Sequence, residues 1–255
     1  MPEFPFDLFR LRSIVMTLKA VLFDFNGVII NDEPLHEQLI EQLLIEENLR
    51  LNPGEYRELC LGRSDRACLS DLLNRRGRMV TDDYLKRLIE RKAHAYRQKL
   101  ETLEKLPIYP GLADFIYQVR VAQVAIGVVS GAIRTEIEFV LQKAQLASYV
   151  SVIVAGDDIQ ASKPDPDGYL LGVERLNQQY PELNAQPCEC LAIEDTFAGI
   201  AAAKSAGMQV VGIANTYPFH MMQRHANWAV DYLSDLELDR VRDVLAQRSL
   251  KPGTV

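Results

Sequence analysis

Apolar residues occur in short continuous runs along much of the chain, and polar or glycine-containing loops separate these runs. The first run, Ala20-Val-Leu-Phe-Asp24-Phe25, is followed by Asn26-Gly27. A continuous apolar run bounded by turn residues is typical of a strand that is buried on both faces, as in parallel sheets. We therefore predict a buried parallel strand that runs into a loop and carries a carboxylate at its end.

A helical period replaces these runs between about Glu33 and Glu104. Apolar residues recur there at spacings of three and four, which places them on one face of a helix. No run of strand length interrupts the segment, so we predict that residues 32–107 form a helical insertion. The apolar positions are Leu35, Leu39, Ile40, Leu43, Leu44, Leu69, Leu72, Leu73, Tyr84, Leu85, Leu88 and Ile89.

Strand and helix patterns alternate after the segment 107–111, which predicts βαβ units and a parallel sheet with helices on both faces. Residues 16–31 and 108–250 would then form one discontinuous domain. The predicted fold class is α/β, a doubly wound, Rossmann-like parallel sheet with an inserted helical domain. The predicted strands span residues 124–129, 150–154, 190–193 and 209–213, and the helices span residues 134–143, 167–176 and 197–206.

Residues 1–15 do not resemble a signal peptide. Asp7 and Arg10 interrupt their apolar residues, and they lack a long apolar core and a small-residue cleavage site. Because Met16 stands just before the first predicted strand, we expect residues 1–15 to be an extension outside the fold or to precede the true start. No run of 18 apolar residues follows, so we expect no transmembrane helix.

The amino-acid composition indicates which classes of binding partner the protein has. The 255 residues carry 28 Lys and Arg against 35 Asp and Glu, a net charge of −7, and 48% of them are hydrophobic. This apolar content argues against disorder, and the acidic balance argues against nucleic acid or a membrane surface as a partner. The chain, with four cysteines, is too long to be a disulfide scaffold, so we expect buried or idle thiols in a reducing cytoplasm. The composition favours a protein that acts on small molecules.

Four loops that follow predicted strands carry residues of complementary chemistry, namely Asp24, Ser130-Gly131, Lys163 and Glu194-Asp195. Open α/β sheets bind ligands at this edge. A carboxylate can attack phosphorus, a hydroxyl with backbone N–H groups can hold phosphate oxygens, and a lysine can neutralise developing charge. The acidic pair would complete an oxygen-ligand site for Mg²⁺.

Each of these residues, taken alone, has an ordinary structural explanation. Asp24 and Ser130 are explained as helix caps or loop ligands, and Lys163 as a solvated surface charge. Glu194-Asp195 is explained as the N-terminal capping of a helix that begins at Phe197. Their joint occurrence, in this order and each after a strand, favours a phosphoryl-transfer site.

With these motifs the sequence resembles the haloacid dehalogenase superfamily, and within it the phosphatases and β-phosphoglucomutase-like enzymes with a helical cap domain after the first motif. The resemblance covers about residues 18–232 and implies that residues 32–107 are the cap. The matching segments are Asp24-Phe-Asn-Gly-Val28, Asn31-Asp-Glu-Pro-Leu-His36, Pro110-Gly111, Ser130-Gly131, Lys163-Pro-Asp-Pro-Asp-Gly-Tyr169, Glu194-Asp-Thr-Phe-Ala-Gly199 and Ala201-Ala-Ala-Lys-Ser-Ala-Gly207.

The resemblance implies a role for each matched core residue. Asp24 would be the nucleophile that accepts the phosphoryl group as an aspartyl phosphate. Ser130, Gly131 and Lys163 would bind phosphate, and Lys163 would also restrain Asp24. The cofactor implied is Mg²⁺, and its ligands would be Asp24, the main-chain carbonyl of Asn26, Glu194 and Asp195.

In the cap, the resemblance suggests that Glu33, His36 and Arg63 contact the substrate or position the cap. Ordinary explanations exist here too: an acidic residue that favours a helix N-terminus, an exposed histidine and a surface arginine after a C-terminal glycine. A cap of this size would exclude large substrates, so sugar phosphates and other small phosphate monoesters fit best.

The sequence departs from the family pattern at Asn26, where similar phosphatases carry the Asp that serves as general acid and base. An amide cannot exchange a proton as a carboxylic acid does. Three explanations stay open: an engineered Asp-to-Asn trap, a phosphatase that is slow or assisted by another group, and a binder that has lost catalysis. Deamidation of Asn26-Gly27, which would recreate the acid, is a further hypothesis.

The function predicted is a Mg²⁺-dependent hydrolase, a phosphatase that acts on a small phosphorylated metabolite through an aspartyl phosphate and is impaired or trapped by Asn26. The alternatives are an inactive phosphometabolite-binding protein and a phosphomutase. No oligomeric state follows from the sequence.

Overall fold

A six-stranded parallel sheet forms the centre of the computed structural model, which describes residues 17–248. The strand order is β3-β2-β1-β4-β5-β6. This order reverses beside β1, and doubly wound sheets bind ligands at such a point, beyond the carboxyl ends of the strands. The strands are β1 (Ala20–Phe23), β2 (Ala125–Val129), β3 (Val152–Val154), β4 (Cys190–Glu194), β5 (Gln209–Ile213) and β6 (Trp228–Val230).

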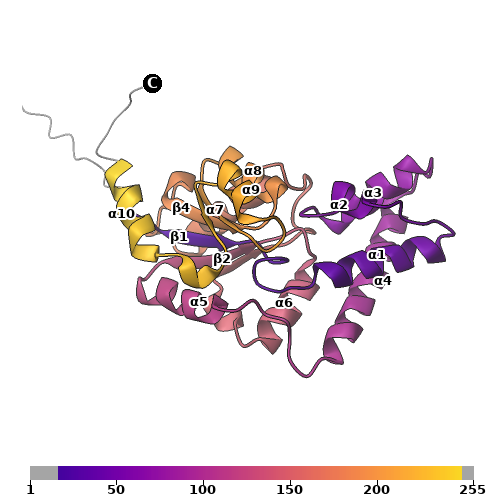
Figure 1. Cartoon of the computed structure of the whole chain (residues 1–255), viewed down its shortest axis with the longest axis horizontal. Helices are drawn as coiled ribbons and strands as arrows, with labels where there is room; N and C mark the ends of the chain where they lie inside the picture. Colours follow the sequence, from indigo (N-terminus) through magenta and orange to yellow (C-terminus); the bar gives the residue numbers. More distant parts are fainter. Residues whose placement is uncertain (1–16, 249–255) are drawn as a thin grey trace, which may run out of the picture.

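Helices cover both faces of the sheet (Figure 1). Strand residues alternate between the two apolar clusters, with Val21 and Phe23 in one and Ala20 and Leu22 in the other, which explains the continuous apolar runs. One face packs on α5 (Leu112–Val121), α6 (Arg134–Lys143) and α10 (Leu238–Arg248), and the other on α7 (Asp167–Gln179), α8 (Phe197–Ser205) and α9 (Phe219–His225). Short 3-10 helices span Ala147–Tyr149, Pro187–Glu189 and Leu233–Asp235.

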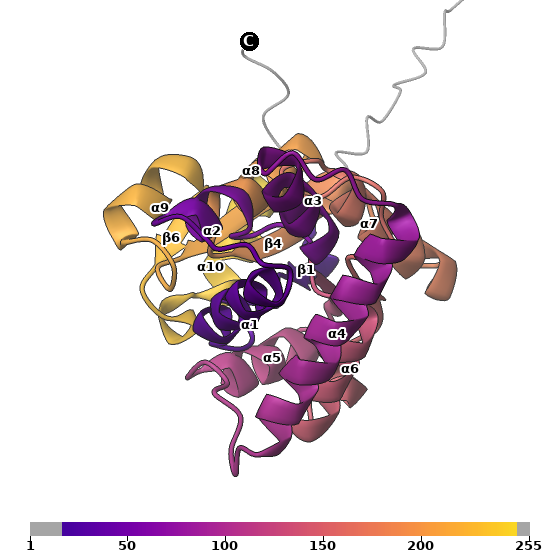
Figure 2. The ribbon, with the colours of Figure 1, turned by 90° about the vertical axis from the view of Figure 1, so that its right-hand side faces the viewer.

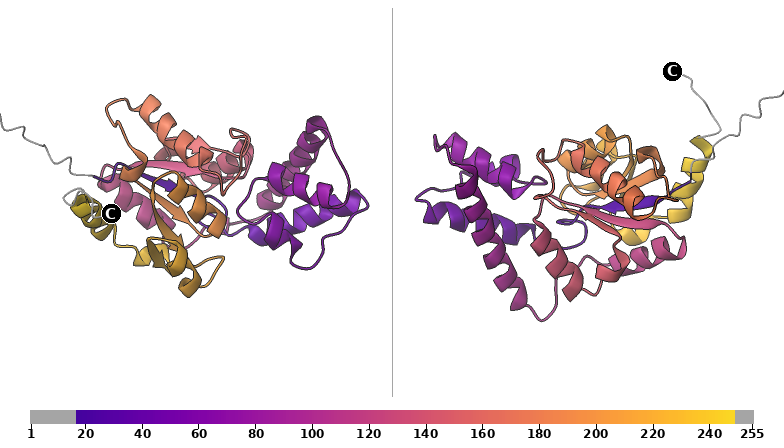
Figure 3. Two further views of the ribbon diagram at one scale, coloured as in Figure 1. Left: turned by 90° about the horizontal axis from the view of Figure 1, so that it is seen from above. Right: turned by 180° about the vertical axis from the view of Figure 1, so that it is seen from behind.

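Four helices between β1 and α5 form what we call the helical insert, and they lie at the carboxyl end of the sheet (Figures 2 and 3). The insert has an apolar cluster of its own, in which leucines on the helical faces seen in the sequence are the most frequent residues. Ser64 and Thr81 cap two of its helices by accepting backbone N–H groups. The helices are α1 (Glu33–Glu46), α2 (Glu55–Leu59), α3 (Asp65–Arg75) and α4 (Asp82–Glu101).

The structure confirms the predicted fold class. The helix predicted at residues 134–143 and the strand at 209–213 have the observed bounds. Helices α5, α9 and α10 were not predicted. None of the helices in the described part of the chain is long and apolar enough to cross a membrane, and the expectation for residues 1–15 lies outside the described residues.

The expectation of reduced thiols is wrong for Cys60 and Cys68, which form a disulfide. Cys60 directly follows α2 and Cys68 lies in α3, and the turn between these helices brings their Cα atoms within 4.5 Å. Cys188 and Cys190 are free thiols, the first exposed and the second buried.

A buried lysine joins the insert to the sheet domain. Lys92 of α4 is 1% exposed, and its Nζ lies 2.8 Å from Asp65 Oδ2 and 3.3 Å from Glu136 Oε1 of α6. Burial alone would lower the pKa of Lys92, but Asp65 and Glu136 raise it to about 12. The lysine is therefore charged and ties two elements of the insert to a core helix.

We expect Lys92→Met to lower the free energy of unfolding by about 3–5 kcal/mol, because it leaves Glu136 buried without its cation. Urea denaturation measures the change. The matched control is Lys86→Met on the same helix, since Lys86 is exposed and its Nζ lies 4.0 Å from Glu90. Equal stability of the two variants would contradict a structural role for the buried pair.

Candidate active site

Asp24 and Lys163 form a buried ion pair at the carboxyl end of β1. Asp24 is 4% exposed, and its Oδ1 accepts the N–H of Phe25 at 2.7 Å and lies 2.8 Å from Lys163 Nζ. Lys163 also donates to the Val129 carbonyl at 3.1 Å and to Glu194 Oε1 at 2.7 Å. Burial lowers the pKa of Lys163, but the two carboxylates more than reverse this, so the ammonium stays charged.

Three carboxylates gather beside this lysine. Asp24, Glu194 and Asp195 each offer an oxygen within 4.8 Å of the others, and all three are buried. Two glycines make room for them: a Cβ at Gly27 would lie 1.9 Å from Asp195 Oδ2, and one at Gly199 would lie 1.9 Å from Glu194 Oε2. The site therefore depends on glycine at both positions.

The carboxylate cluster fits a divalent cation. Burial and the charge of Asp24 raise the pKa of Glu194 to about 7, and burial with the charges of Asp24 and Glu194 raises the pKa of Asp195 well above its ordinary value. Asp195 Oδ1 is buried and has no hydrogen-bond partner among the described residues. An unpartnered oxygen in a crowded acidic cluster is what a hard cation such as Mg²⁺ would satisfy.

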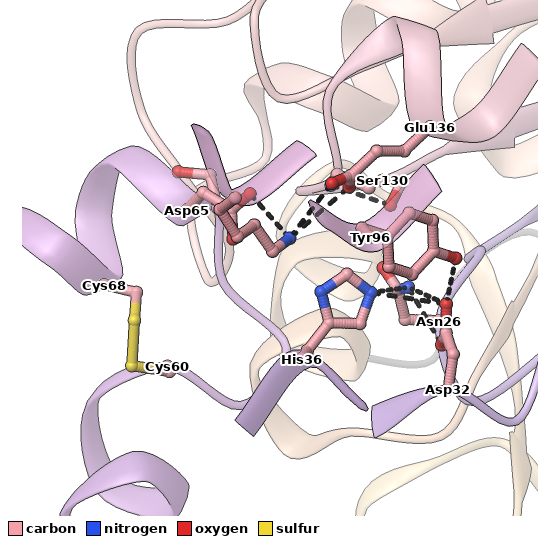
Figure 4. A network of polar contacts seen from close by, with 12 residues as sticks. Asn26, Asp32, His36, Cys60, Asp65, Cys68, Tyr96, Ser130 and Glu136 are labelled. Atoms are coloured by element: carbon pink, nitrogen blue, oxygen red, sulfur yellow. Dashed lines mark hydrogen bonds and ion pairs between the residues drawn. A yellow bond between two sulfur atoms is a disulfide. The ribbon is translucent and has the colours of Figure 1, made fainter. Parts of the chain in front are cut away.

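Asn26 lies in a polar network that the sequence did not reveal (Figure 4). Its Nδ2 donates to the carboxylate of Asp32 at 3.0 Å and lies 2.9 Å from His36 Nε2. Tyr96 donates its hydroxyl to Asp32 and stacks on His36 with ring centroids 4.8 Å apart. Asp32 and His36, at the start of α1, thus hold the amide of Asn26, and Tyr96 of α4 contacts both of them. An acidic residue before a helix and a helical tyrosine carry no distinctive signal in the sequence.

Ser130 and Gly131 follow β2, next to β1 in the sheet. Ser130 is buried and its Oγ accepts the N–H of Ala132 at 3.0 Å. A Cβ at Gly131 would lie 2.6 Å from the carbonyl oxygen of Arg63, so glycine allows the insert to approach the core here.

The insert and the sheet enclose a narrow cavity above Asp24. Its free space is about 30 Å³, room for only one or two water molecules. Asp24, Asn26 and Gly131 line it from the core, and Glu33, His36 and Arg63 line it from the insert. The structure thus brings six of the sequence-predicted residues, three from each part, to the lining of one cavity.

Two of the insert residues are already engaged by neighbours. The Arg63 guanidinium donates to the Leu59 carbonyl and to Asp71 Oδ2, both at 2.8 Å. Glu33 accepts the Tyr56 hydroxyl at 2.6 Å, and burial raises the pKa of Glu33. Arg63 therefore lines the cavity while its charge is balanced on the insert.

Residues 18–207 match the family model of the haloacid dehalogenase-like hydrolases. The chain belongs to this family. It is 28% identical to beta-phosphoglucomutase from Bacillus subtilis, over 92% of this chain and 98% of that protein. It is 26% identical to the phosphorylated carbohydrates phosphatase of Thermotoga maritima, over 78% of this chain and 87% of the relative. The crystal structure of beta-phosphoglucomutase from Clostridium difficile matches with a TM-score of 0.78 at 22% identity, covering 92% and 100% of the two chains.

Membership confirms the resemblance that the motifs indicated. The part of this haloacid dehalogenase-like hydrolase that matches the family model contains every candidate site residue, from Asp24 to Asp195. The likeness to the solved structure extends over the helical insert as well as the sheet, because it covers 92% of the chain.

We expect Mg²⁺ to stabilise this hydrolase, since a cation would offset the repulsion among three buried carboxylates. At a concentration 100 times its Kd, the gain in free energy of unfolding is about 2.7 kcal/mol. Thermal denaturation with Mg²⁺ and with a chelator measures the effect. Asp195→Asn should abolish the response to Mg²⁺, whereas Asp83→Asn, at an exposed site, should retain it. An equal response in both variants would place the cation elsewhere.

Proposed function

We propose that the protein is a Mg²⁺-dependent phosphatase that acts on a small phosphorylated metabolite, with sugar phosphates as the leading class. The observation that carries the proposal is the Asp24–Lys163 pair within an acidic cluster at the carboxyl edge of the sheet. The two relatives named above support the substrate class, since one is a phosphomutase of a sugar phosphate and the other a phosphatase of phosphorylated carbohydrates.

In this proposal the carboxylate of Asp24 attacks the phosphorus of the substrate. Phe25 and Lys163 both engage Oδ1, so we assign the attack to Oδ2. Lys163 holds Asp24 in place and balances negative charge, and the N–H groups that follow β2 would hold phosphoryl oxygens. Mg²⁺, held by Asp24, Glu194, Asp195 and the Asn26 carbonyl, would supply positive charge to the phosphoryl group.

We further propose that the insert, within residues 32–107, acts as a cap on the core formed by residues 16–31 and 108–250. The free space of about 30 Å³ is far smaller than a sugar phosphate, so a substrate must enter while the cap is open. Closure would then exclude bulk water from the reaction. The narrow cavity favours small substrates over macromolecules.

Asn26 supports a second candidate, a phosphometabolite-binding protein without turnover. The expected general acid and base is absent from this position, and the side-chain amide is held by Asp32 and His36. Those two residues are where a substitute proton donor would have to be sought if the protein does turn over. A phosphomutase is the weakest candidate, because it needs the proton to move in both directions.

Phosphate release from a broad panel of phosphorylated metabolites, with Mg²⁺ and with a chelator, tests the proposal. The phosphatase predicts release that depends on Mg²⁺ and is fastest for one class of small monoester. Ligand-dependent thermal stabilisation without any release would favour the binding protein instead. Release that is unaffected by the chelator would contradict the proposed role of the acidic cluster.

A further inference from the structure

The Cys60–Cys68 disulfide lies on the wall of the candidate active site. Both cysteines line the cavity above Asp24, yet they are only 6% and 2% exposed. Figure 4 shows the disulfide joining two segments of the insert, with Asp65 and His36 on the same side of it. It closes a short covalent ring that contains the turn between α2 and α3. Four residues of this ring, from Gly62 to Asp65, the first residue of α3, are called the contact strip.

The contact strip touches the core beside three of the candidate catalytic residues. Its neighbours in the core are Gly131, Ser162 and Thr196. In the sequence these residues adjoin Ser130, Lys163 and Asp195, respectively. The Gly62 backbone lies so near Thr196 that a Cβ at Gly62 would be 2.6 Å from Thr196 Oγ1. The Arg63 carbonyl packs on Gly131. The Ser64 N–H donates a hydrogen bond to Ser162 Oγ at 2.7 Å.

The end of the contact strip is fixed by charge. Asp65 Oδ2 lies 2.8 Å from the buried Nζ of Lys92, which also pairs with Glu136 of the core. The strip is thus held covalently at both flanks, by backbone contacts in its middle and by an ion pair at its end.

We propose that the Cys60–Cys68 disulfide is a redox-controlled latch for closure of the insert over the active site. When it is formed, the disulfide limits the conformations of the contact strip and preorganises it against the core. When it is reduced, α2 and α3 are no longer cross-linked and the strip gains freedom. The consequence for catalysis rests on the proposed phosphatase function, whereas the consequence for the strip does not.

The switch is a thiol–disulfide exchange with a dithiol reductant. One thiolate of the reductant attacks a sulfur of the disulfide, the S–S bond breaks, and the second thiol resolves the mixed disulfide. Two electrons and two protons pass to Cys60 and Cys68, and the reductant becomes a disulfide. A small-molecule disulfide reverses the reaction. Because both cysteines are buried, exchange requires the insert to open.

Hydrogen exchange of the Arg63 and Ser64 amides tests the latch without any substrate. These amides donate to the Cys60 carbonyl and to Ser162 Oγ. We expect exchange to be about fivefold or more faster after reduction by dithiothreitol, and in the Cys60→Ser/Cys68→Ser variant, than in the oxidised chain. Alkylation and mass spectrometry verify two free thiols before reduction and four after it. Cys188→Ser, which leaves the disulfide intact, should behave as the parent chain.

Kinetics with p-nitrophenyl phosphate and Mg²⁺ test the link to the active site. Reduction should raise KM about fivefold or more while kcat changes less. Inorganic phosphate with Mg²⁺ should slow reduction, because a ligand that favours the closed insert keeps both cysteines buried. Equal amide exchange in the two redox states would overturn the latch, and unchanged KM with altered exchange would overturn its control of the site. If no form hydrolyses the ester or binds phosphate, the phosphatase proposal fails while amide exchange still decides the latch.

Discussion

The Asp24→Asn variant is expected to release phosphate at least about 10⁴-fold more slowly than the parent chain, because its amide cannot attack phosphorus. The variant keeps the shape of the side chain and removes one of the three clustered carboxylates. Its fold should therefore persist while the reaction stops. Phosphate release under single-turnover conditions measures the loss.

Asp114→Asn is the matched control for this experiment, because Asp114 is exposed on α5 and lies outside the cavity. It should release phosphate at the parent rate. Circular dichroism and thermal denaturation confirm that both variants fold. An Asp24→Asn variant that retains most of the activity would exclude Asp24 as the nucleophile.

The Asn26→Asp variant is expected to gain about 10²–10⁴-fold in rate, the range that a positioned general acid and base contributes. The new carboxyl can protonate the leaving oxygen and then activate the water that hydrolyses the phosphoenzyme. The gain from protonating the leaving oxygen should be larger for a sugar phosphate, whose alcohol leaves poorly, than for p-nitrophenyl phosphate. Steady-state kinetics on both substrates separate the two contributions.

Asn31→Asp adds the same charge at an exposed position near the site and should leave the rate unchanged. Peptide mapping of the parent chain before each assay shows whether Asn26 has deamidated, since a trace of deamidated chain would mimic slow turnover. Failure of Asn26→Asp to gain activity on any phosphorylated metabolite would favour the binding protein over the phosphatase.

The core of the candidate site was predictable because parallel strands bring their carboxyl ends to one edge. Asp24, Lys163 and Glu194 lie far apart in the sequence, yet each follows a strand or its loop, and the structure places them in direct contact. Their catalytic roles stay predictions, but their grouping at one edge of the sheet follows from the parallel direction of the strands.

The contacts of the insert were less predictable, because they depend on how its helices pack on the core. Asp32 looks like an ordinary acidic residue before a helix, and Tyr96 looks like part of an amphipathic face. Yet Asp32 accepts hydrogen bonds from Asn26 and Tyr96, and Tyr96 stacks on His36. The Cys60–Cys68 pair depends on the turn between α2 and α3, which apolar spacing does not encode.

The state of Asp24 during turnover tests the central claim most directly. The parent chain is incubated with Mg²⁺ and acetyl phosphate, whose leaving group needs no protonation, then quenched in acid and mapped by mass spectrometry. Our account predicts one phosphoryl group on the peptide that contains Asp24, accumulating in the parent chain because Asn26 cannot activate water, and short-lived in Asn26→Asp. A phosphoryl group on another residue, or phosphate release with Asp24 unmodified throughout, would contradict it.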